Sequence, residues 1–398
     1  MEDGARRLLA LLGLAVLFEG YGRSLPGVAL AHIGNDLGAG SSALSFALAL
    51  IASGALGVIV LGWLGDQFGR RTLLLVSVAG YAVLGAATAS VSSLAALVAW
   101  QALARMFQDG ALTGAAVIAA EEMPADRRGA TQGALGLMNQ LGAGIAAIGF
   151  AGVALVPGGW RGLMLVSLTP LAFLPFLARS LPESRRWTAR VRGARGPLPA
   201  RFRGRLFVSA VVAFLAMSYD VAGFTFTAYV PMTEHGWSPA AVSAMFIVAG
   251  GLGLPGWWVG GTLADRFGRR PCAFAFLVCL TLAEVAFFRL GAAALWPAFG
   301  AMVFCQSGKT AVLRAWSTEL FPTAWRGSAA AWLAASATLG GIAGLAIAGA
   351  LAPRVGGIAP ALALVAGAGL LAAAGSTLLP ETGGLELEAI APDASPHG

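Results

Sequence analysis

The sequence has little charge and few residues suited to catalysis or metal binding. Of its 398 residues, 11% are charged and 58% are apolar, whereas soluble domains carry about 25% charged and 45–50% apolar residues. This composition argues against a soluble enzyme, which would expose too much apolar surface, and against a disordered chain. The three cysteines fit no disulfide or zinc framework, and neither a phosphate-binding loop nor a nucleophile elbow is present. We therefore expect a protein that is not an enzyme and that needs no cofactor.

Long apolar segments fill most of the chain instead. A bilayer core of about 30 Å requires about 20 helical residues, so 398 residues leave room for roughly twelve spans with short connections. Glycine accounts for 55 residues, about twice its ordinary share, which suits helices that pack closely in lipid. We expect an all-α membrane protein with twelve transmembrane helices. The predicted spans are residues 8–30, 43–64, 72–92, 94–120, 130–154, 161–180, 206–231, 240–262, 272–290, 296–320, 328–351 and 358–379.

The basic residues lie mainly on one side of the predicted spans. With a cytoplasmic N-terminus, 19 of the 26 Lys and Arg residues fall at cytoplasmic ends and loops, 3 fall on the outer side and 4 fall within spans. This is the positive-inside pattern, and it explains the net charge of +7 without nucleic acid. A cleaved signal peptide is the alternative for the N-terminus, but Glu19 and Arg23 interrupt its apolar region. We expect a multi-pass protein of the cell (inner) membrane, in contact with the lipid bilayer, with both termini cytoplasmic.

Three sequence landmarks occur twice at almost the same offset. Residues 62–71 (GWLGDQFGRR) return 199 positions later as GTLADRFGRR, while EEMP at 121–124 and LPES at 181–184 return 198 positions later as ELFP and LPET. Such repetition indicates a duplicated unit, and six spans per half keep the two halves parallel. The predicted organisation is an N-terminal six-helix half at 1–184, a basic cytoplasmic linker at 185–205 and a C-terminal half at 206–398 that ends in a short cytoplasmic tail.

These landmarks resemble motifs of the major facilitator superfamily along the whole chain. The Asp-x-x-Gly-Arg-Arg loops after spans 2 and 8 match its best-known signature, and RMFQDG at 105–110 looks like its Arg-x-x-Gln-Gly motif. Residues 18–22 (FEGYG) are similar to the Asp-Gly-Phe/Tyr-Asp element of aromatic-acid/proton symporters, with Glu19 in place of the first Asp. Residues 182–187 and 380–384 look like the sugar-porter and organic-ion branch. The resemblance implies two pseudo-symmetric six-helix halves, in which spans 1, 4, 7 and 10 line a central cavity.

The repeated cytoplasmic signature has the chemistry of a gating latch. Asp66 ends span 2 and can accept hydrogen bonds from a helix N-terminus, and the following arginines can pair with acids at the ends of spans 4 and 10. Such pairs would break when the cytoplasmic side opens, so they would set the balance between outward-open and inward-open states. The other interpretation is topology alone, with positive charge retained inside. The predicted latch residues are Asp66, Arg70, Arg71, Glu121, Asp265, Arg269, Arg270 and Glu319.

Ionisable residues within the spans are the candidates for substrate binding and proton coupling. A charge at mid-membrane costs roughly 2.5–3.5 kcal/mol, so it usually faces a cavity or a partner. Glu19–Arg23 and Arg105–Asp109 are i,i+4 pairs that can share a helix face; each is either functional or a static ion pair. Lys309 is a candidate anchor for an anionic substrate group. The predicted substrate or proton-coupling residues are Glu19, Tyr21, Arg23, Arg105, Asp109, Asp220, Phe224 and Lys309.

Together these features predict a secondary active transporter with alternating access. We expect a monomer that takes up a small organic anion, such as an aromatic or related carboxylate, by symport with protons as the coupling ion. Four acids and four bases lie within the spans, so charge alone does not choose an anionic over a cationic substrate. One alternative is a proton-antiport exporter of drugs or organic cations, and another is a non-transporting sensor or scaffold. Glu284, on the predicted span 9, receives no role from the sequence.

Overall fold

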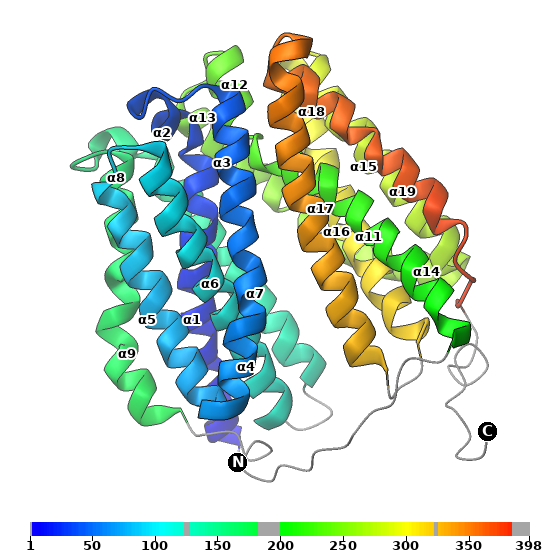
Figure 1. The fold of residues 1–398 in the computed structure, drawn as a ribbon, viewed down its shortest axis with the longest axis horizontal. Helices are drawn as coiled ribbons and strands as arrows, with labels where there is room; N and C mark the ends of the chain where they lie inside the picture. Colours follow the sequence, from blue (N-terminus) through cyan, green and yellow to red (C-terminus); the bar gives the residue numbers. More distant parts are fainter. Residues whose placement is uncertain (1, 123–127, 182–199, 322–324, 384–398) are drawn as a thin grey trace. The chain divides into compact units, whose positions relative to one another are not determined.

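The computed structural model describes residues 2–122, 128–181, 200–321 and 325–383, which are helical almost throughout (Figure 1). In the N-terminal half the helices are α1 (Glu2–Val28), α2 (Leu30–Asp36), α3 (Ser41–Ser53), α4 (Val58–Phe68), α5 (Arg70–Ala87), α6 (Leu94–Glu122), α7 (Arg128–Ala151), α8 (Trp160–Leu165) and α9 (Thr169–Ser180). In the C-terminal half they are α11 (Ala200–Thr225), α12 (Tyr229–Glu234), α13 (Pro239–Gly250), α14 (Gly253–Phe267), α15 (Arg269–Arg289), α16 (Leu295–Glu319), α17 (Arg326–Val355), α18 (Ile358–Ala366) and α19 (Ala368–Ser376).

Ten segments of the described residues are long and apolar enough to cross a membrane. The predicted spans 4 and 10, which form α6 and α16, are absent from these ten. Both helices carry ionisable residues in mid-helix, such as Asp109 on α6 and Lys309 on α16, which lower their apolar character. With these two helices the count is twelve, and the predicted fold class of an all-α membrane protein with two six-helix halves is confirmed.

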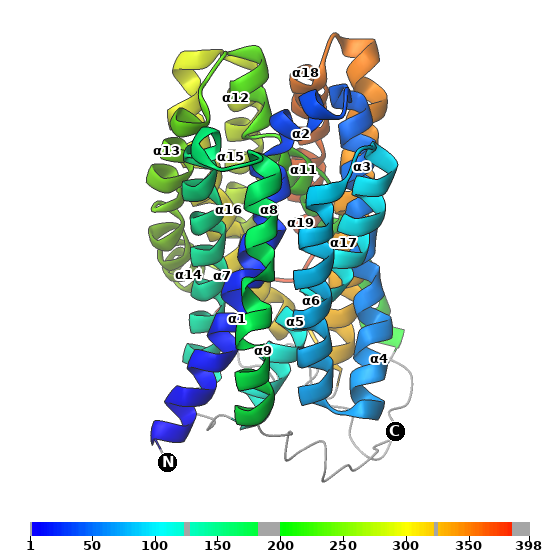
Figure 2. The ribbon, with the colours of Figure 1, turned by 90° about the vertical axis from the view of Figure 1, so that its left-hand side faces the viewer.

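Several predicted spans are interrupted rather than continuous (Figure 2). Span 2 consists of α3, a short 3₁₀ turn at Gly54–Gly57, and α4, while its repeat mate, span 8, consists of α13 and α14. Span 6 is interrupted at Val166–Leu168, so that α8 and α9 follow one another end to end, and span 12 is divided into α18 and α19. Membrane helices tolerate such interruptions because neighbouring groups satisfy the freed backbone.

The chain divides into two compact units that nearly follow the two sequence halves. Unit 1 comprises Met1–Gly40, Leu50–Ala194 and Trp237–Ala244, and unit 2 comprises Ser41–Ala49, Arg195–Gly236 and Met245–Gly398. The short segment Ser41–Ala49 belongs to unit 2, where Ser45 Oγ donates a hydrogen bond to the Leu345 carbonyl at 2.6 Å. In the same way Ser243 Oγ donates to the Ala147 carbonyl at 2.6 Å within unit 1.

Most of the predicted linker lies outside the described residues, but its last part is helical. Helix α11 begins at Ala200, six residues before the predicted start of span 7. The guanidinium groups of Arg201 and Arg205 lie 4.9 and 5.3 Å from the centre of the Phe202 ring. Such cation–π contacts allow a basic turn to extend an apolar helix. The predicted linker, which ended at residue 205, therefore included the first turns of α11.

The two units repeat the same helix pairing. Helix α1 packs along α7 in unit 1, as α11 packs along α17 in unit 2, and the pair α5 and α6 corresponds to the pair α15 and α16. Equivalent glycines permit close approaches in both pairs. A Cβ atom on Gly142 would lie 1.9 Å from the Leu17 carbonyl oxygen, and one on Gly340, 198 positions later, would lie 2.1 Å from that of Phe214. The duplication seen in the sequence is therefore also a duplication of packing.

Candidate functional site

Four ionisable side chains of α1 and α6 form a continuous network within unit 1. Arg23 Nε lies 2.5 Å from Glu19 Oε1, and Arg23 Nη2 donates to Asp109 Oδ1. Arg105 Nε lies 3.1 Å from Asp109 Oδ2. Glu19 is fully buried and also accepts a hydrogen bond from Asn139 Nδ2 on α7. We call Glu19, Arg23, Arg105 and Asp109 the α1–α6 network.

The α1–α6 network is electrically balanced, with two acids and two bases. Arg105 is its most exposed member, with 30% of its side chain accessible. Among the residues that the structure describes, the partner of Arg105 is Asp109, reached through Nε. The two terminal nitrogens of Arg105 are therefore left for another group, and a guanidinium edge suits a carboxylate, which it can bind through two parallel hydrogen bonds.

A second charged cluster lies in unit 2 between α11 and α16. Lys309 Nζ lies 2.5 Å from Asp220 Oδ2 and 5.7 Å from the centre of the Tyr219 ring. The side chains of Lys309 and Asp220 are only 3% and 5% exposed. The structure therefore joins two of the predicted residues as a buried ion pair, and Lys309 meets a carboxylate of the protein rather than an open cavity.

Glu284 is the functional candidate that sequence reasoning left without a role. It lies on α15, is fully buried, and neither of its carboxylate oxygens has a hydrogen-bond partner in the described part of the chain. The sequence signal was present, because an acidic residue within an apolar span usually has a function. Span 9 is not among the spans that the resemblance expects to line the cavity, so the prediction gave Glu284 no role.

Two predicted aromatic residues lie outside both charged clusters. Tyr21 is 2% exposed, and its hydroxyl donates to the Leu163 carbonyl at 2.8 Å. This bond ties α1 to α8 and leaves Tyr21 little surface for a ligand. Phe224 is half-buried, and its ring packs against Phe299 with 6.2 Å between the ring centres. In this structure, therefore, both residues serve helix packing.

The latch residues of unit 2 form a network around Arg269. Arg269 Nη1 lies 2.5 Å from Asp265 Oδ1, and Nη2 lies 3.0 Å from Glu319 Oε1. Thr382 Oγ1 donates to the other Glu319 oxygen at 2.5 Å. These contacts connect the end of α14, the start of α15, the end of α16 and the segment after α19. Arg270 is the remaining predicted latch residue of unit 2, and its backbone N–H donates a hydrogen bond to Glu381.

Glu381 completes this network at the N-terminus of α15. Its carboxylate accepts hydrogen bonds from the backbone N–H groups of Arg269 and Arg270 at 2.7 and 2.9 Å, and from those of Thr382 and Gly383 at 2.9 and 2.8 Å. Partial burial raises the pKa of Glu381, but the four N–H donors outweigh it and hold the pKa below its usual value. Sequence reasoning used Glu381 only as a landmark of the repeat, because its partner helix begins more than a hundred residues earlier.

The latch of unit 1 shares the backbone of its counterpart. Gly69 and Gly268 precede the paired arginines of the two signatures, and both have φ of 99°, a conformation that favours glycine. Arg71 Nη2 donates to the Ala178 carbonyl on α9, and Arg70 is half-buried at the start of α5. The side chains of Asp66 and Glu121 lie outside the described residues, so the predicted contacts of these two acids stay predictions.

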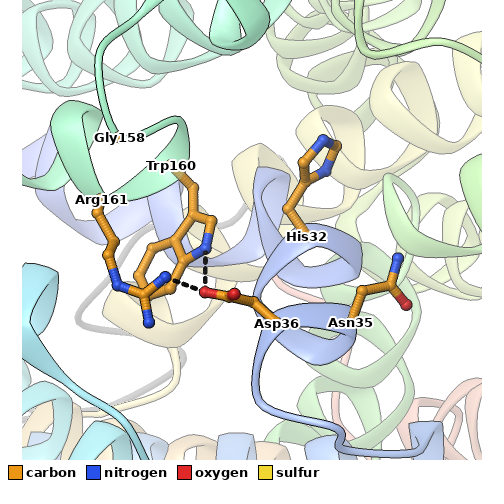
Figure 3. Close-up of a pocket in the computed structure, with 6 residues that line it drawn as sticks. All are labelled: His32, Asn35, Asp36, Gly158, Trp160 and Arg161. Atoms are coloured by element: carbon orange, nitrogen blue, oxygen red, sulfur yellow. Dashed lines mark hydrogen bonds and ion pairs between the residues drawn. The ribbon is translucent and has the colours of Figure 1, made fainter.

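A pocket of about 400 Å³ opens at the end of unit 1 where α2 follows α1 (Figure 3). Asp36 Oδ2 accepts hydrogen bonds there from Trp160 Nε1, at 3.2 Å, and from Arg161 Nη1. His32 packs edge-on against Phe150 with 5.2 Å between ring centres, and burial lowers its pKa. None of the predicted site residues lines this pocket, so we place the candidate site at the two charged clusters.

Comparison with known proteins supports the resemblance seen in the sequence. Residues 12–308 match the family model described as Major Facilitator Superfamily. The chain is 26% identical over 397 residues to the gallate transporter of Pseudomonas putida (86% of this chain and 85% of the relative). It is 26% identical to the 3-(3-hydroxy-phenyl)propionate transporter of Escherichia coli (strain K12), over 70% of each chain. Among solved structures, the inward open conformation of the xylose transporter XylE from E. coli superposes with a TM-score of 0.79 at 18% identity, covering 97% of this chain and 99% of that one.

Proposed function

The chain belongs to the Major Facilitator Superfamily, and from this premise we propose that it is a proton-coupled symporter of aromatic carboxylates. It is a multi-pass membrane transporter of a small molecule and not an enzyme. The observation that carries the proposal is the similarity to a gallate transporter over 86% of the chain, joined by a second relative named as a 3-(3-hydroxy-phenyl)propionate transporter. Both of these named substrates are aromatic carboxylates.

The anion-binding group in this proposal is Arg105. Its terminal nitrogens have no partner among the described residues, and it is the most exposed member of the α1–α6 network. A substrate carboxylate can occupy both nitrogens at once, which a lysine could not reproduce. Asp109 holds the guanidinium in place through Nε, so the site is already oriented before the substrate arrives.

Charge balance within the network supplies the reason for proton coupling. The four side chains sum to zero, so a substrate carboxylate would add an uncompensated negative charge to a buried region, which is costly. One proton taken up by Glu19, which is fully buried, restores neutrality. Arg23, released from Glu19, then becomes available to the substrate or to Asp109. Binding of the anion and of the proton thus favour each other, as symport requires.

The decisive experiment is uptake of labelled gallate into proteoliposomes, with the pH gradient imposed in each direction. We expect accumulation when protons flow inward with the substrate, and equilibration only when the gradient is absent. An Arg105→Lys variant should lose most of the uptake while it retains the charge, because the two-point contact is gone. Proton-driven extrusion of cationic dyes without gallate transport would overturn the proposal in favour of an antiport exporter. Movement of no solute at all would favour a sensor or scaffold.

The same proposal includes the location and assembly of the protein. The excess of arginine at one side of the predicted spans favours the cell (inner) membrane with both termini in the cytoplasm. A monomer suffices, since each charged cluster is built within one chain. Cysteine accessibility at each terminus in intact cells tests the orientation, and light scattering of the purified protein tests the monomer.

A further inference from the structure

Glu284 is the buried acid that the proposed transport mechanism does not use. It lies in the middle of α15 with no accessible surface, and both of its oxygens lack a hydrogen-bond partner among the described residues. An ionised carboxylate in such a place would cost several kcal/mol without a compensating partner. A neutral carboxylic acid removes most of that cost. The surroundings of Glu284 therefore favour a bound proton.

The neighbours of Glu284 define a cluster with one base and two acids. Its carboxylate lies against α11, where a Cβ atom on Gly223 would come within 2.8 Å of Oε2. Asp220 lies one helical turn earlier on the same face of α11. Lys309 is bound to Asp220, whose other oxygen, Oδ1, has no hydrogen-bond partner in the described part of the chain.

Tyrosine and cysteine side chains also lie on the helices of this cluster. They are Tyr219 on α11, Cys305 on α16 and Cys279 on α15 itself. Helices α18 and α19, which also pack against α15, contain no ionisable residue. With Lys309 positive, the cluster is neutral only when one of its two acids holds a proton.

We propose that Glu284 is a proton-binding site of the C-terminal half, which exchanges its proton with Asp220 as Lys309 changes partner. In the structure Lys309 pairs with Asp220, and Glu284 is the neutral acid. When the ammonium group turns to Glu284, the proton leaves the Glu284 carboxyl and binds the Asp220 carboxylate, while Lys309 remains protonated throughout. Charge and protons balance in both arrangements. Because Asp220 lies on α11, the proton moves from α15 to a helix that is expected to line the cavity.

This inference deepens the proposed symport and rests on it for its role in transport, but the bound proton can be tested without transport. Infrared spectroscopy of the purified protein in lipid nanodiscs distinguishes a protonated carboxyl by its carbonyl stretching band, which ionised carboxylates lack. At neutral pH we expect this band in the wild type and its loss in Glu284→Gln. The matched control is Glu234→Gln, because Glu234 is an exposed acid on α12 and its replacement should leave the band unchanged.

Three further measurements can refute the inference. Gln resembles a protonated Glu in shape, so Glu284→Gln should fold with an unchanged unfolding temperature, and Glu284→Asp should retain the band at a shifted frequency. Gly223→Ala, which places a methyl group against the carboxyl, should also shift it. A wild-type spectrum without the band, or a band that persists unchanged in Glu284→Gln, would overturn the assignment.

Transport then tests what the site does. Glu284→Gln should retain gallate binding and gallate exchange across the membrane but lose accumulation driven by a pH gradient. If the wild type moves no gallate, the proposed function fails, while the infrared band still decides whether Glu284 holds a proton. If the band is lost in Glu284→Gln and accumulation is normal, the proton does not take part in coupling, and its proposed exchange with Asp220 is refuted.

Discussion

The charged clusters of the two halves differ in balance and in exposure. The α1–α6 network has two acids and two bases, and its Arg105, Arg23 and Asp109 side chains are 30%, 23% and 17% exposed. The cluster of unit 2 has two acids and one base, and all three are buried almost completely. The repeat has therefore preserved the helix packing while the chemistry of the two halves has diverged.

This difference suggests that the two clusters have different functions. A balanced, partly exposed network with free guanidinium nitrogens is suited to receive an anion, whereas a dry cluster with one surplus acid is suited to hold a proton. Because an ion pair in a dry environment is strongly coupled, the loss of one member should reduce stability more in unit 2 than in unit 1. Each of the following experiments compares one half with the other.

The largest effect is expected from breaking the ion pair of unit 2. Lys309→Met leaves Asp220 buried without a partner, so we expect a loss of roughly 3–5 kcal/mol of stability, as for other buried pairs broken on one side. The double variant Lys309→Met, Asp220→Asn should recover much of that loss, but not transport. Arg105→Met in unit 1 should cost about 1 kcal/mol or less, because the pair is partly solvated and Arg23 still holds Asp109. Thermal unfolding measures all three, and equal losses in the two halves would refute the contrast.

The next comparison concerns coupling in unit 1. Glu19→Gln removes the carboxylate that is proposed to take up a proton when the substrate binds, so we expect loss of accumulation driven by the pH gradient while exchange of gallate is retained. The amide introduced by Glu19→Gln retains an oxygen that can accept the hydrogen bond from Asn139, so the variant should still fold. Counterflow and gradient-driven uptake, measured on the same proteoliposomes, separate the two properties. Normal accumulation by Glu19→Gln would remove Glu19 from the coupling role.

Local spacing predicted part of these clusters. The i,i+4 positions of Glu19 and Arg23 and of Arg105 and Asp109 are enough to place each pair on one helix face, and both pairs are in contact in the structure. The bond between Arg23 and Asp109, which are 86 residues apart, joins the two pairs. It depends on how α1 and α6 pack against each other, and this packing cannot be inferred from the spacing of residues along one helix.

The fold, like the charged clusters, was predictable only in part. Apolar length and the three repeated landmarks were enough for twelve helices in two halves, because those signals are either local or periodic. The interruption of span 6 at Val166–Leu168 was not predicted, since a membrane helix tolerates a break wherever its neighbours satisfy the backbone. Glu284 was overlooked for a related reason: the absence of a partner is visible only once every neighbour is placed.

A moderate effect is expected at the latch of unit 2. Glu319→Gln removes the charged acceptor of Arg269 and weakens the bond from Thr382, and hydrogen bonds to charged groups contribute roughly 1.5–3 kcal/mol. If these contacts stabilise one transport state, turnover should change while the affinity for gallate stays close to that of the wild type. Asp265→Asn is the internal control, because Asp265 is 73% exposed and its pairing should contribute little. In unit 1, Glu121→Gln, at the repeat position of Glu319, tests whether the other latch responds in the same way, and unaltered turnover in both halves would leave only a topological role.

The smallest expected effect is on stability at the N-terminus of α15. Glu381→Gln retains one oxygen acceptor but loses the charge that faces the helix N-terminus, so we expect a loss of about 1 kcal/mol at neutral pH. The loss must depend on pH, because the pKa of Glu381 is lower in the folded protein than in the unfolded chain. The stability that its carboxylate contributes is therefore present above the ordinary pKa of 4.5 and disappears as the pH falls through the folded value. Thermal unfolding of wild type and Glu381→Gln should accordingly differ at pH 7 and converge on acidification. A difference that is constant across this range would show that Glu381 acts through its shape and not through its charge, and the latch of unit 2 would then rest on Arg269 and Glu319 alone.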